Sequence, residues 1–419
     1  MTPEGWRRAT VADVAEVNPE QLGGDTPAAH ELLYLDIASV ERTGHLGAPA
    51  AYKFANAPSR ARRRVRSGDI LVSTVRPYLR SFAQLRKTPP NLVASTGFAV
   101  VRPLDVTDSD FLYQHVLAAD FVEFLKPRMK GGNYPAVTGS DVASYPLVLP
   151  PPPERRKIAA ILSSVDDAIE ASQAVIGQLQ VVKKAMMAEL LTKGLPGRHK
   201  KFKQTEIGQV PDEWIVYTVG EILADGPTNG IYKPAHLIGR GTLLAGMTAI
   251  DDETLRWAAC RRAELDRDED SRYGLAAGDI LVTRVYARID GVGRFIVVPD
   301  TSETTVFESN MMRIRVDRSL VRPGFLAALM RLPALRKQIE QRATLGAQAS
   351  LNSDSLRTLP VCLPPLDEQD KLMAALNGVS ERLRSEQIHL AAATDLKSAL
   401  MSILLTGEVR VRVDEEGAA

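Results

Sequence analysis

Cysteine is nearly missing from this chain of 419 residues, and the two that occur, Cys260 and Cys362, form neither a zinc-site spacing nor a disulfide framework. Cys362 lies in the apolar run Leu359–Leu363, where we expect a small buried thiol. The histidines are scattered without zinc-like spacing, at His30, His45, His115, His199, His236 and His389. We therefore expect no metal in this chain and a reducing, cytoplasmic environment.

Long hydrophobic runs are missing as well. No stretch approaches the roughly 18 apolar residues that a membrane span needs. The opening segment Met1–Arg8 also lacks the apolar core of a secretory signal. We expect no membrane association.

Catalytic motifs are missing too. There is no Gly-x-x-x-x-Gly-Lys-Ser/Thr loop, and the pair Gly291 and Gly293 lacks the third glycine of a dinucleotide fingerprint. The Asn/Asp-Pro-Pro-aromatic motif of amino-methyltransferases does not occur. Pro211–Glu213 and Pro299–Asp300 lack the later acid-x-Lys of a nuclease site. These absences predict a chain without catalytic activity of its own, since an enzyme would need an active site of unrecognised type.

Net charge is only +1, but the charges are unevenly distributed. Residues 51–90 contain ten Lys or Arg and one acid, and residues 310–342 contain eight basic residues and two acids. Acidic residues gather at Asp251–Asp270 and Asp414–Glu416 instead. A phosphate backbone responds to such local patches and not to the mean charge. A basic run can equally be an ordinary solvated face.

The chain contains one large internal repeat. The segment Leu149–Leu162 aligns without a gap with Leu363–Leu376, and the match continues to the Leu-Leu-Thr of each copy. Further upstream the offset drifts, as loop insertions would cause, where Ser67–Val75 matches Ala277–Val285. Trp6 in the first copy corresponds to Trp214 in the second, and we expect both in the core. A duplication of about two hundred residues predicts two similar domains.

Each copy ends in a segment with a helical stripe of apolar residues. In the first copy the stripe comprises Ile158, Leu162, Val165, Ile169, Ile176, Leu179, Val182, Met186 and Leu190, and in the second Leu372, Leu376, Val379, Leu383, Leu390, Ala393, Leu396, Leu400 and Leu404. Steps of three and four predict two long helices, which prolines start and Gly194 and Gly407 stop. Such stripes favour an antiparallel coiled coil. Ser172 and Glu386 interrupt them, either to fix register or because they face solvent.

Outside these helices the sequence predicts short strands and a few helices. Asp69–Ser73 and Asp279–Thr283 are β-rich runs entered by Gly-Asp turns, and Leu92–Val101 and Gly293–Val298 are expected to be strands. We expect helices at Phe111–Lys130 and Pro323–Arg342. The fold class is therefore mixed α/β (α+β), with two globular domains, two long helices and a pseudo-two-fold repeat.

An ordered set of motifs now resembles a known family. Leu363–Gln369, with its Leu-Pro-Pro-Leu-Asp-Glu-Gln, and the later Leu-Leu-Thr-Gly at 404–407 resemble the conserved region of Type I restriction–modification specificity subunits. Thr205–Trp214, the Gly-Asp-Ile-Leu-Val strands and Thr344–Asn352 fit the same pattern. The first copy departs from it at Pro153–Arg155, which leaves the local helix start open, and at Gly132–Pro135, as expected where domains read different sequences.

The resemblance implies a DNA-recognition subunit without catalytic activity or cofactors of its own. Each of two target-recognition domains would read half of a split, asymmetric site in double-stranded DNA. The helices would set the spacing and dock two methyltransferase (M) subunits, which use S-adenosylmethionine. Restriction/translocase (R) subunits would supply ATP- and Mg-dependent cleavage. A helix of nearly forty residues spans roughly 57 Å, or about one and a half turns of DNA.

Candidate DNA-binding residues follow from the same reasoning. In the first domain the loop after the Asp69 strand offers base-reading or groove-lining side chains, an arginine cluster offers phosphate contacts, and a glycine loop adds more. These are Ser73, Arg76, Tyr78 and Arg80, then Arg60, Arg62, Arg63, Arg64 and Arg66, and finally Lys130, Asn133 and Tyr134. The second domain offers Thr283, Arg284, Tyr286, Arg288, Gln348 and Ser350. Gln348 could read adenine or simply cap its loop, and the arginine cluster could be an exposed turn without a role.

We predict target-recognition domains at 1–149 and 196–363, spacer helices at 150–195 and 364–407, and an acidic tail at 408–419. The alternative function is a duplicated sequence-specific DNA-binding adaptor of another phage-defence system, acting without methylation.

Overall fold

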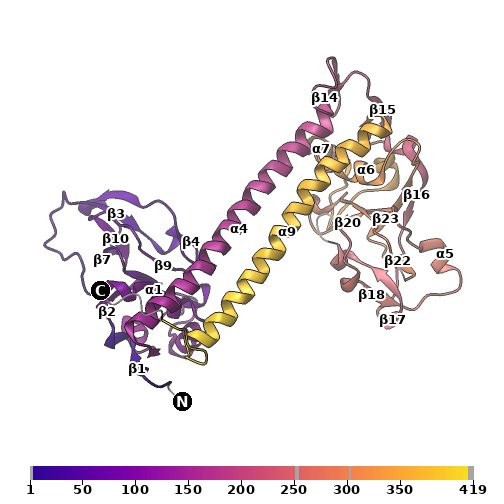
Figure 1. The fold of residues 1–419 in the computed structure, drawn as a ribbon. Coiled ribbons are helices and arrows are strands. Elements are labelled where there is room, and N and C mark those ends of the chain that lie inside the picture. The colour runs from indigo at the N-terminus through magenta and orange to yellow at the C-terminus, as the bar shows by residue number, and fades with distance from the viewer. Residues whose placement is uncertain (1–2, 251–253, 302, 414–419) are drawn as a thin grey trace. The chain divides into compact units, whose positions relative to one another are not determined.

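The computed structural model describes residues 3–250, 254–301 and 303–413. The chain forms two compact units: unit 1 joins residues up to Ala174 with those from Gln387 on, and unit 2 is Val175–Glu386. Each unit contains a β-rich globular part and one half of each of two long helices, α4 (Pro152–Lys193) and α9 (Leu366–Leu404) (Figure 1). This confirms the expected mixed α/β class. The acidic tail Asp414–Glu416 and residues 251–253 of the acidic stretch lie outside the described residues.

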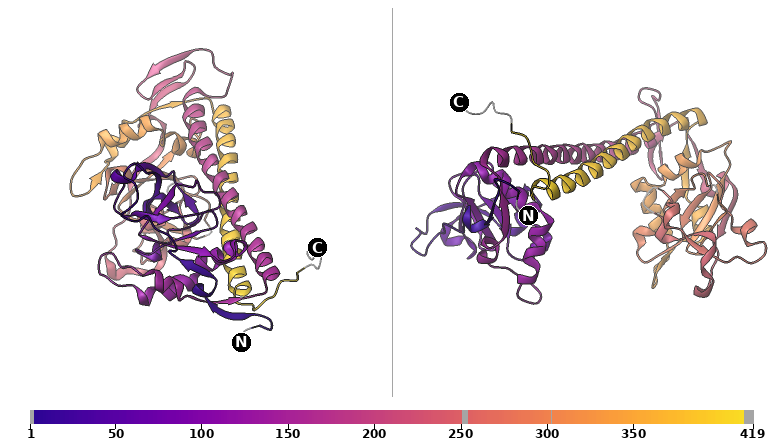
Figure 2. Two further views of the ribbon diagram at one scale, coloured as in Figure 1. Left: turned by 90° about the vertical axis from the view of Figure 1, so that its left-hand side faces the viewer. Right: turned by 60° about the horizontal axis from the view of Figure 1, so that its bottom comes forward.

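In each unit the two helix halves run antiparallel and side by side (Figures 1 and 2). In unit 1, Ile158 of α4 and Leu404 of α9 share one core with the globular part, and in unit 2, Leu190 and Leu372 do the same. The predicted helices are confirmed, and so are their glycine stops. Gly194 and Gly407 both adopt left-handed φ angles, of 74° and 77°, as at many helix ends.

The apolar stripes are confirmed at their buried ends and wrong at one equivalent position in each copy. Val182 and Leu396 are 45% and 52% exposed. A straight helix drifts relative to a seven-residue repeat, which turns such positions out of the seam. Of the two interrupting residues, Ser172 is half-buried. Glu386 is buried, so it does not face solvent, and it pairs with Arg382 one turn earlier at 2.6 Å.

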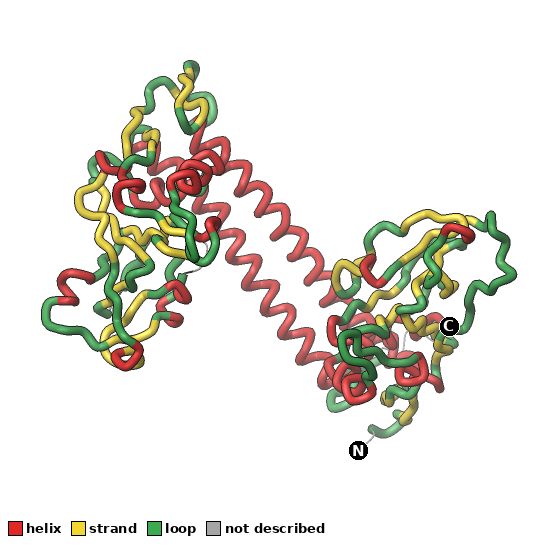
Figure 3. Tube along the Cα trace, turned by 180° about the vertical axis from the view of Figure 1, so that it is seen from behind, coloured by secondary structure: helices red, strands yellow, loops and turns green. Residues whose placement is uncertain are grey.

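Unit 1 has two four-stranded sheets, ordered β6-β3-β10-β7 and β2-β11-β8-β9, and two strand pairs, β1-β12 and β4-β5. Figure 3 shows these strands with the connecting loops. The strands are β1 (Arg7–Thr10), β2 (Ala15–Val17), β3 (Glu31–Leu35), β4 (Val40–Arg42), β5 (His45–Leu46), β6 (Ala50–Lys53), β7 (Ala61–Arg64), β8 (Ile70–Ser73), β9 (Phe82–Gln84), β10 (Leu92–Ser95), β11 (Phe98–Pro103) and β12 (Pro146–Leu149). The short helices are α1 (Ser109–Leu117), α2 (Ala119–Leu125) and α3 (Gly139–Ala143).

Unit 2 has sheets ordered β16-β23-β19-β21 and β18-β17-β22, with the pairs β13-β14, β15-β25 and β20-β24. The strands are β13 (Phe202–Thr205), β14 (Gly208–Pro211), β15 (Ile215–Thr218), β16 (Leu223–Asn229), β17 (Ile238–Ala245), β18 (Arg261–Ala263), β19 (Ile280–Thr283), β20 (Val285–Tyr286), β21 (Phe295–Val297), β22 (Thr305–Phe307), β23 (Met311–Val316), β24 (Ala349–Ser350) and β25 (Pro360–Leu363). The short helices are α5 (Glu269–Tyr273), α6 (Pro323–Leu329), α7 (Pro333–Arg342) and α8 (Ser353–Arg357).

The repeat seen in the sequence is also a repeat of topology. The order β2-β11-β8-β9 of unit 1 returns as β16-β23-β19-β21 in unit 2, with the same antiparallel pairings. The strand after each tryptophan pairs with the strand that leads into the long helix, with Arg7 opposite Leu149 and Ile215 opposite Leu363. Each duplicated segment therefore builds the same scaffold.

Three predicted elements are each broken into two, and one strand is shorter than expected. Leu92–Val101 is two strands joined at Thr96 and Gly97. Phe111–Lys130 contains α1 and α2, separated where Ala118 takes an extended backbone. Pro323–Arg342 is broken before Pro333, which starts α7 because proline fits a first helical turn. The expected strand at Gly293–Val298 covers only Phe295–Val297.

Both tryptophans lie in the core, as predicted, with Trp6 7% and Trp214 0% exposed. Trp6 Nε1 donates at 3.0 Å to Glu154, a buried acid in the first turn of α4. Arg410, just after α9, donates to the same carboxylate at 2.8 Å. In unit 2 the equivalent acid, Glu368 at the start of α9, instead contacts His199 Nε2 at 2.8 Å and accepts from a backbone amide after α4. In each unit, then, one buried carboxylate holds the start of one long helix to the segment that follows the other.

Candidate nucleic-acid interface

The Gly-Asp turn before each central strand is held in place by hydrogen bonds to its aspartate. Asp69 is buried, accepts from the Arg66 amide at 2.8 Å, and receives Nε and Nη2 of Arg102 at 2.9 and 2.8 Å. Asp279 receives Arg315 in the same way, at 2.8 and 3.1 Å. The hydrogen bonds to Asp69 raise the pKa of the Arg102 guanidinium, so this arginine stays charged. The strands β8 and β19 are fully buried and carry the following loops at fixed positions.

In unit 1 the structure brings together the loop after β8 (residues 74–81) and the glycine loop (residues 129–138). We call these two segments, and their equivalents in unit 2, the loop pair. Val75 forms an antiparallel bridge with Ala136, and the Arg76 amide donates to Pro135 at 2.8 Å. The Arg76 guanidinium lies over the Tyr134 ring, 4.6 Å from its centroid, and Nη2 donates to the Asn133 carbonyl at 2.7 Å. The two segments had been predicted separately and form one surface.

Several other candidates share this surface. Tyr134 is 70% exposed and Tyr78 43%, while Lys130 and Asn133 are also exposed. Solvent-facing tyrosine, lysine and arginine side chains on adjoining loops are the groups that contact nucleic-acid backbones and bases.

Unit 2 builds the same loop pair with different side chains. β20 pairs with β24, so that Val285 lies opposite Ser350, and Thr344 bridges Ser350 as Lys130 bridges Ala136 in unit 1. Gln348 is exposed at the tip, and Ser350 is half-buried. Tyr286 is half-buried because it packs against Gly291, where an added Cβ would come within 2.0 Å of its ring. Arg288 is exposed and pairs with Asp290 at 3.0 Å.

Four candidate side chains are engaged inside the protein. Ser73 and Thr283 are buried, and their hydroxyls donate to the carbonyls of Val75 at 2.8 Å and Gly291 at 2.6 Å. Both therefore brace the turn after the buried strand and are not part of the exposed surface. Arg284 Nη1 donates to the Ser309 carbonyl at 3.2 Å.

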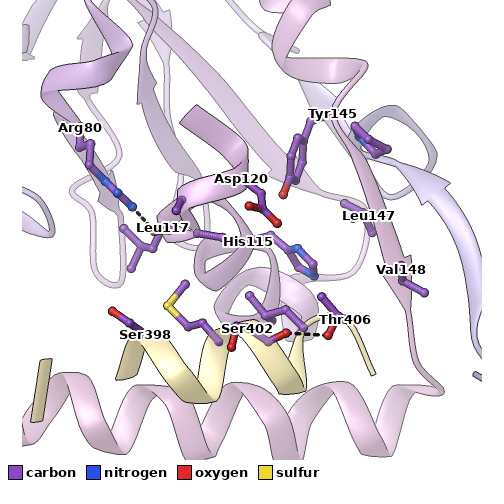
Figure 4. A pocket seen from close by; sticks show the side chains of 15 residues that line it. Arg80, His115, Leu117, Asp120, Tyr145, Leu147, Val148, Ser398, Ser402 and Thr406 are labelled. Atoms are coloured by element: carbon purple, nitrogen blue, oxygen red, sulfur yellow. Dashed lines mark hydrogen bonds between the residues drawn. The ribbon is translucent and has the colours of Figure 1, made fainter. Parts of the chain in front are cut away.

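Arg80 is the fourth, and its guanidinium donates to the Leu117 carbonyl at the end of α1 (Figure 4). It lines a pocket of about 400 Å³ in unit 1, between the α1–α2 junction and the last turns of α9. His115 in this pocket is buried, and burial lowers its pKa to about 4, so it is neutral at physiological pH. Arg80 thus connects the loop after β8 to the helical part of its unit.

The arginine cluster lies on and around β7, an edge strand of its sheet. Arg60 and Arg64 are exposed, and Arg62 lies over the Phe54 ring at 4.7 Å. Arg63 is half-buried, which lowers its pKa. Arg66 is paired with Glu20.

Three backbone hydrogen bonds connect the Arg60 end of this cluster to the loop pair. The Arg60 carbonyl accepts from Thr96, the Gly97 carbonyl from Thr74, and the Thr74 carbonyl from Val137, at 2.8 to 2.9 Å. Arg60 is therefore the member of the cluster nearest to Arg76 along this path.

One exposed aromatic residue near the loop pair of unit 2 was not among the predicted DNA-binding residues. Tyr232 in unit 2 is 78% exposed. Its neighbour Ile231 exchanges backbone hydrogen bonds with Phe307 and Ser309, and Ser309 in turn accepts from Arg284. The only signal in the sequence was an aromatic residue close to a glycine and a lysine, which is too common to single it out.

Two further features bear on function. Among the residues that the structure describes, no three His, Cys, Asp or Glu side chains are grouped so that they could hold a metal ion. None of the helices in the described ranges combines the length and the apolarity that a bilayer crossing requires.

Known proteins resemble this chain in sequence. A profile of the Type I restriction modification DNA specificity domain matches residues 57–180, which include the arginine cluster and both loops of unit 1. The MjaVIII specificity subunit of a Type I restriction enzyme from Methanocaldococcus jannaschii is 24% identical over 77% of this chain and 75% of its own length. The StySPI specificity subunit of Salmonella potsdam is 25% identical over 55% of this chain and 50% of its own.

Known structures share the fold. A chain solved for complex assembly and conformational transition of the type I R-M system has a TM-score of 0.59 at 22% identity, over 98% of this chain and 100% of that one. A Type-I restriction-modification S subunit from M. genitalium has a TM-score of 0.59 at 12% identity, over 97% and 99% of the two chains.

Proposed function

Because this chain belongs to the family of Type I restriction–modification DNA specificity subunits, we propose that it reads a bipartite, asymmetric site in double-stranded DNA, one half-site per unit. As a specificity subunit it is the non-catalytic, DNA-recognising member of a complex with other subunits. We assign the two target-recognition domains to residues 1–149 and 196–363. They act in the cytoplasm on chromosomal or incoming DNA.

The duplicated loop pair is the observation that carries this proposal. Each unit mounts a loop after a buried strand and pairs it with a glycine loop, through Val75 and Ala136 in one and Val285 and Ser350 in the other. The scaffold is the same, but the exposed side chains are not. Two loop pairs with the same backbone arrangement but different exposed side chains are suited to reading two different half-sites.

The helices at 150–195 and 364–407 set the spacing and dock two methyltransferase (M) subunits in this proposal. Both carry exposed apolar side chains, with Val181 70% exposed on α4 and Ile388 61% on α9. In this proposal the contact with the M subunits removes these side chains from water, which favours association. The M subunits bring S-adenosylmethionine for adenine methylation, and R subunits bring ATP- and Mg-dependent translocation and cleavage.

Co-expression with a Type I methyltransferase (M) subunit tests the proposal. We expect sequencing of modified bases to reveal one split motif, methylated only when both proteins are present. Binding of a split site without methylation by any M subunit would favour the adaptor function instead. Methylation that is independent of this chain would contradict the proposal.

A further inference from the structure

The Arg76 side chain is held in one orientation before any ligand arrives. Its backbone adopts a left-handed φ of 48°, and its amide is bound to Pro135. Its guanidinium lies 4.6 Å from the Tyr134 ring centroid and donates to the Asn133 carbonyl at 2.7 Å. An arginine fixed in this way loses less rotamer freedom on binding than a free one does.

The N–H groups of Arg76 that have no partner in the part of the chain that the structure describes match the hydrogen-bond acceptors on the edge of one base. Arginine has five N–H groups, and in Arg76 the Nε atom is buried without a partner among the described residues. One N–H of Nη2 is bound to Asn133, so three N–H groups of the two terminal nitrogens are left. Two neighbouring N–H groups of a planar fork are complementary to the O6 and N7 acceptors of guanine in the major groove.

We infer that Arg76 reads a guanine in the half-site of unit 1 and that Tyr134 is the residue that positions it. This inference rests on the proposed function and names one base of its substrate. The neighbouring Arg80 is held in a different part of unit 1, where it donates to the Leu117 carbonyl and lines the pocket beside the ends of α1 and α9.

Among the residues that the structure describes, the loop pair of unit 2 contains no arginine at the position of Arg76. The repeat places Tyr286 where unit 1 has Arg76, and Tyr286 packs against Gly291. The exposed part of its glycine loop, residues 345–348, carries leucine, glycine, alanine and glutamine instead of the asparagine–tyrosine pair. The dependence on Arg76 is therefore confined to one half-site, and the other half-site is an internal control.

The test is the methylated motif of the full chain with its methyltransferase partner, for wild type and for Arg76→Lys. Lysine keeps the charge and can replace a phosphate contact, but it has no planar fork. We expect the wild-type motif to contain guanine in the affected half-site. We also expect R76K to reduce methylation there by at least about tenfold and to remove the preference for guanine at that one position.

Two further variants separate reading from folding. Tyr134→Phe keeps the ring under Arg76 and should keep the motif, while Tyr134→Ala should weaken the preference at the same single position. Arg128→Lys is the matched control, because Arg128 also lies over an aromatic ring, Phe124, at 3.5 Å, and donates to a carbonyl of the same helix, yet is not part of the loop pair.

The inference is overturned if R76K retains the guanine preference or lowers methylation evenly at all sequences. It is also overturned if the wild-type motif lacks guanine in the half-site that R76K affects. If the wild-type chain directs no sequence-specific methylation at all, the proposed function itself fails.

Discussion

Arg155 in the first turn of α4 binds the carboxylate of Asp108 at 2.6 Å, and the second repeat makes this contact with the charges exchanged. There Arg322 stands in the place of the acid, and it binds Asp370 in the first turns of α9 at 2.8 and 3.0 Å. Asp108 and Arg322 are the residues that directly precede α1 and α6. The counterpart of Arg155 in the second copy is Gln369, whose side chain accepts from the Arg322 amide at 2.9 Å, and Asp370 one residue later makes the charged contact.

The inverted charges also specify which domain packs on which helix. Exchanging the domains between the helices would place Asp108 against Asp370 and Arg322 against Arg155. Like charges in contact are unfavourable, so each globular part is matched to the helix that follows it in sequence.

Reversing one charge in unit 1 should therefore be costly, and reversing both should restore the contact. The side chains of Arg155 and Asp108 are only 13% and 9% exposed. We expect Arg155→Asp to lower the free energy of unfolding by about 3 kcal/mol, because it leaves a buried acid without its partner. The double variant Asp108→Arg with Arg155→Asp should recover most of this loss in urea unfolding.

The pair in unit 2 is the control for that measurement. Arg322 and Asp370 are 39% and 54% exposed, so Arg322→Asp should cost no more than about 1 kcal/mol. If the double variant in unit 1 is as unstable as the sum of the two single variants, the contact does not act as a pair.

The buried carboxylate of Glu154 should make unit 1 sensitive to acid. Burial alone would raise its pKa, but the hydrogen bonds from Arg410 and Trp6 outweigh burial, and the pKa is lowered. Since the folded pKa is below the unfolded one, the charge stabilises the fold above the ordinary glutamate pKa of about 4.3. That contribution is lost as the pH falls through the folded pKa.

Glu154→Gln tests this. We expect the variant to be less stable than wild type at pH 7, and to lose less stability than wild type between about pH 5 and pH 3. Glu170→Gln is the matched control, since Glu170 is exposed on the same helix and its removal should leave the wild-type curve in place. Parallel curves for wild type and Glu154→Gln would show that the carboxylate carries no such linkage.

Periodic and repeated features were predictable from the sequence, and contacts between distant segments were not. The stripe ending in Leu190 predicted α4 because a helix imposes its own spacing, and duplication made Trp6 and Trp214 recognisable as one position. Ser73 is buried because both faces of β8 are covered, and the segments that cover them include parts of the chain far away in the sequence. Likewise, nothing near Arg80 indicates that the end of α1 would bind it.

The arginine cluster should contribute to affinity without contributing to sequence preference. We expect Arg62→Ala with Arg64→Ala to weaken DNA binding across all sequences and to lower the salt slope by up to about two units. Titration of the complex against specific and unrelated duplexes at several salt concentrations measures both quantities. Arg66→Ala should change the slope less, because Glu20 already compensates its charge. An unchanged slope in the double variant would place the cluster outside the DNA contact.

The glycine that ends α4 should not tolerate a side chain. Gly194 has a left-handed φ of 74°, and an added Cβ would lie 2.7 Å from Glu368 Oε1 and from the His199 ring. The left-handed backbone alone costs an L-residue about 1–2 kcal/mol. The close contact adds to this, because Glu368 is itself held by the segment after α4 and has little room to move. Gly194→Ala should therefore lower the free energy of unfolding of unit 2 by about 2 kcal/mol or more.

Gly177 lies in the middle of the same helix, and there we expect a change to alanine to stabilise the protein. It is exposed, and an added Cβ would meet nothing within 4 Å. Alanine has a higher helix propensity than glycine, so Gly177→Ala should stabilise α4 by up to about 1 kcal/mol. Thermal unfolding of both variants and of wild type tests the two predictions. The Tm should fall for Gly194→Ala and rise for Gly177→Ala. A loss for Gly177→Ala equal to that for Gly194→Ala would mean that α4 needs flexibility along its length, and that the contact with Glu368 is not what makes Gly194 necessary.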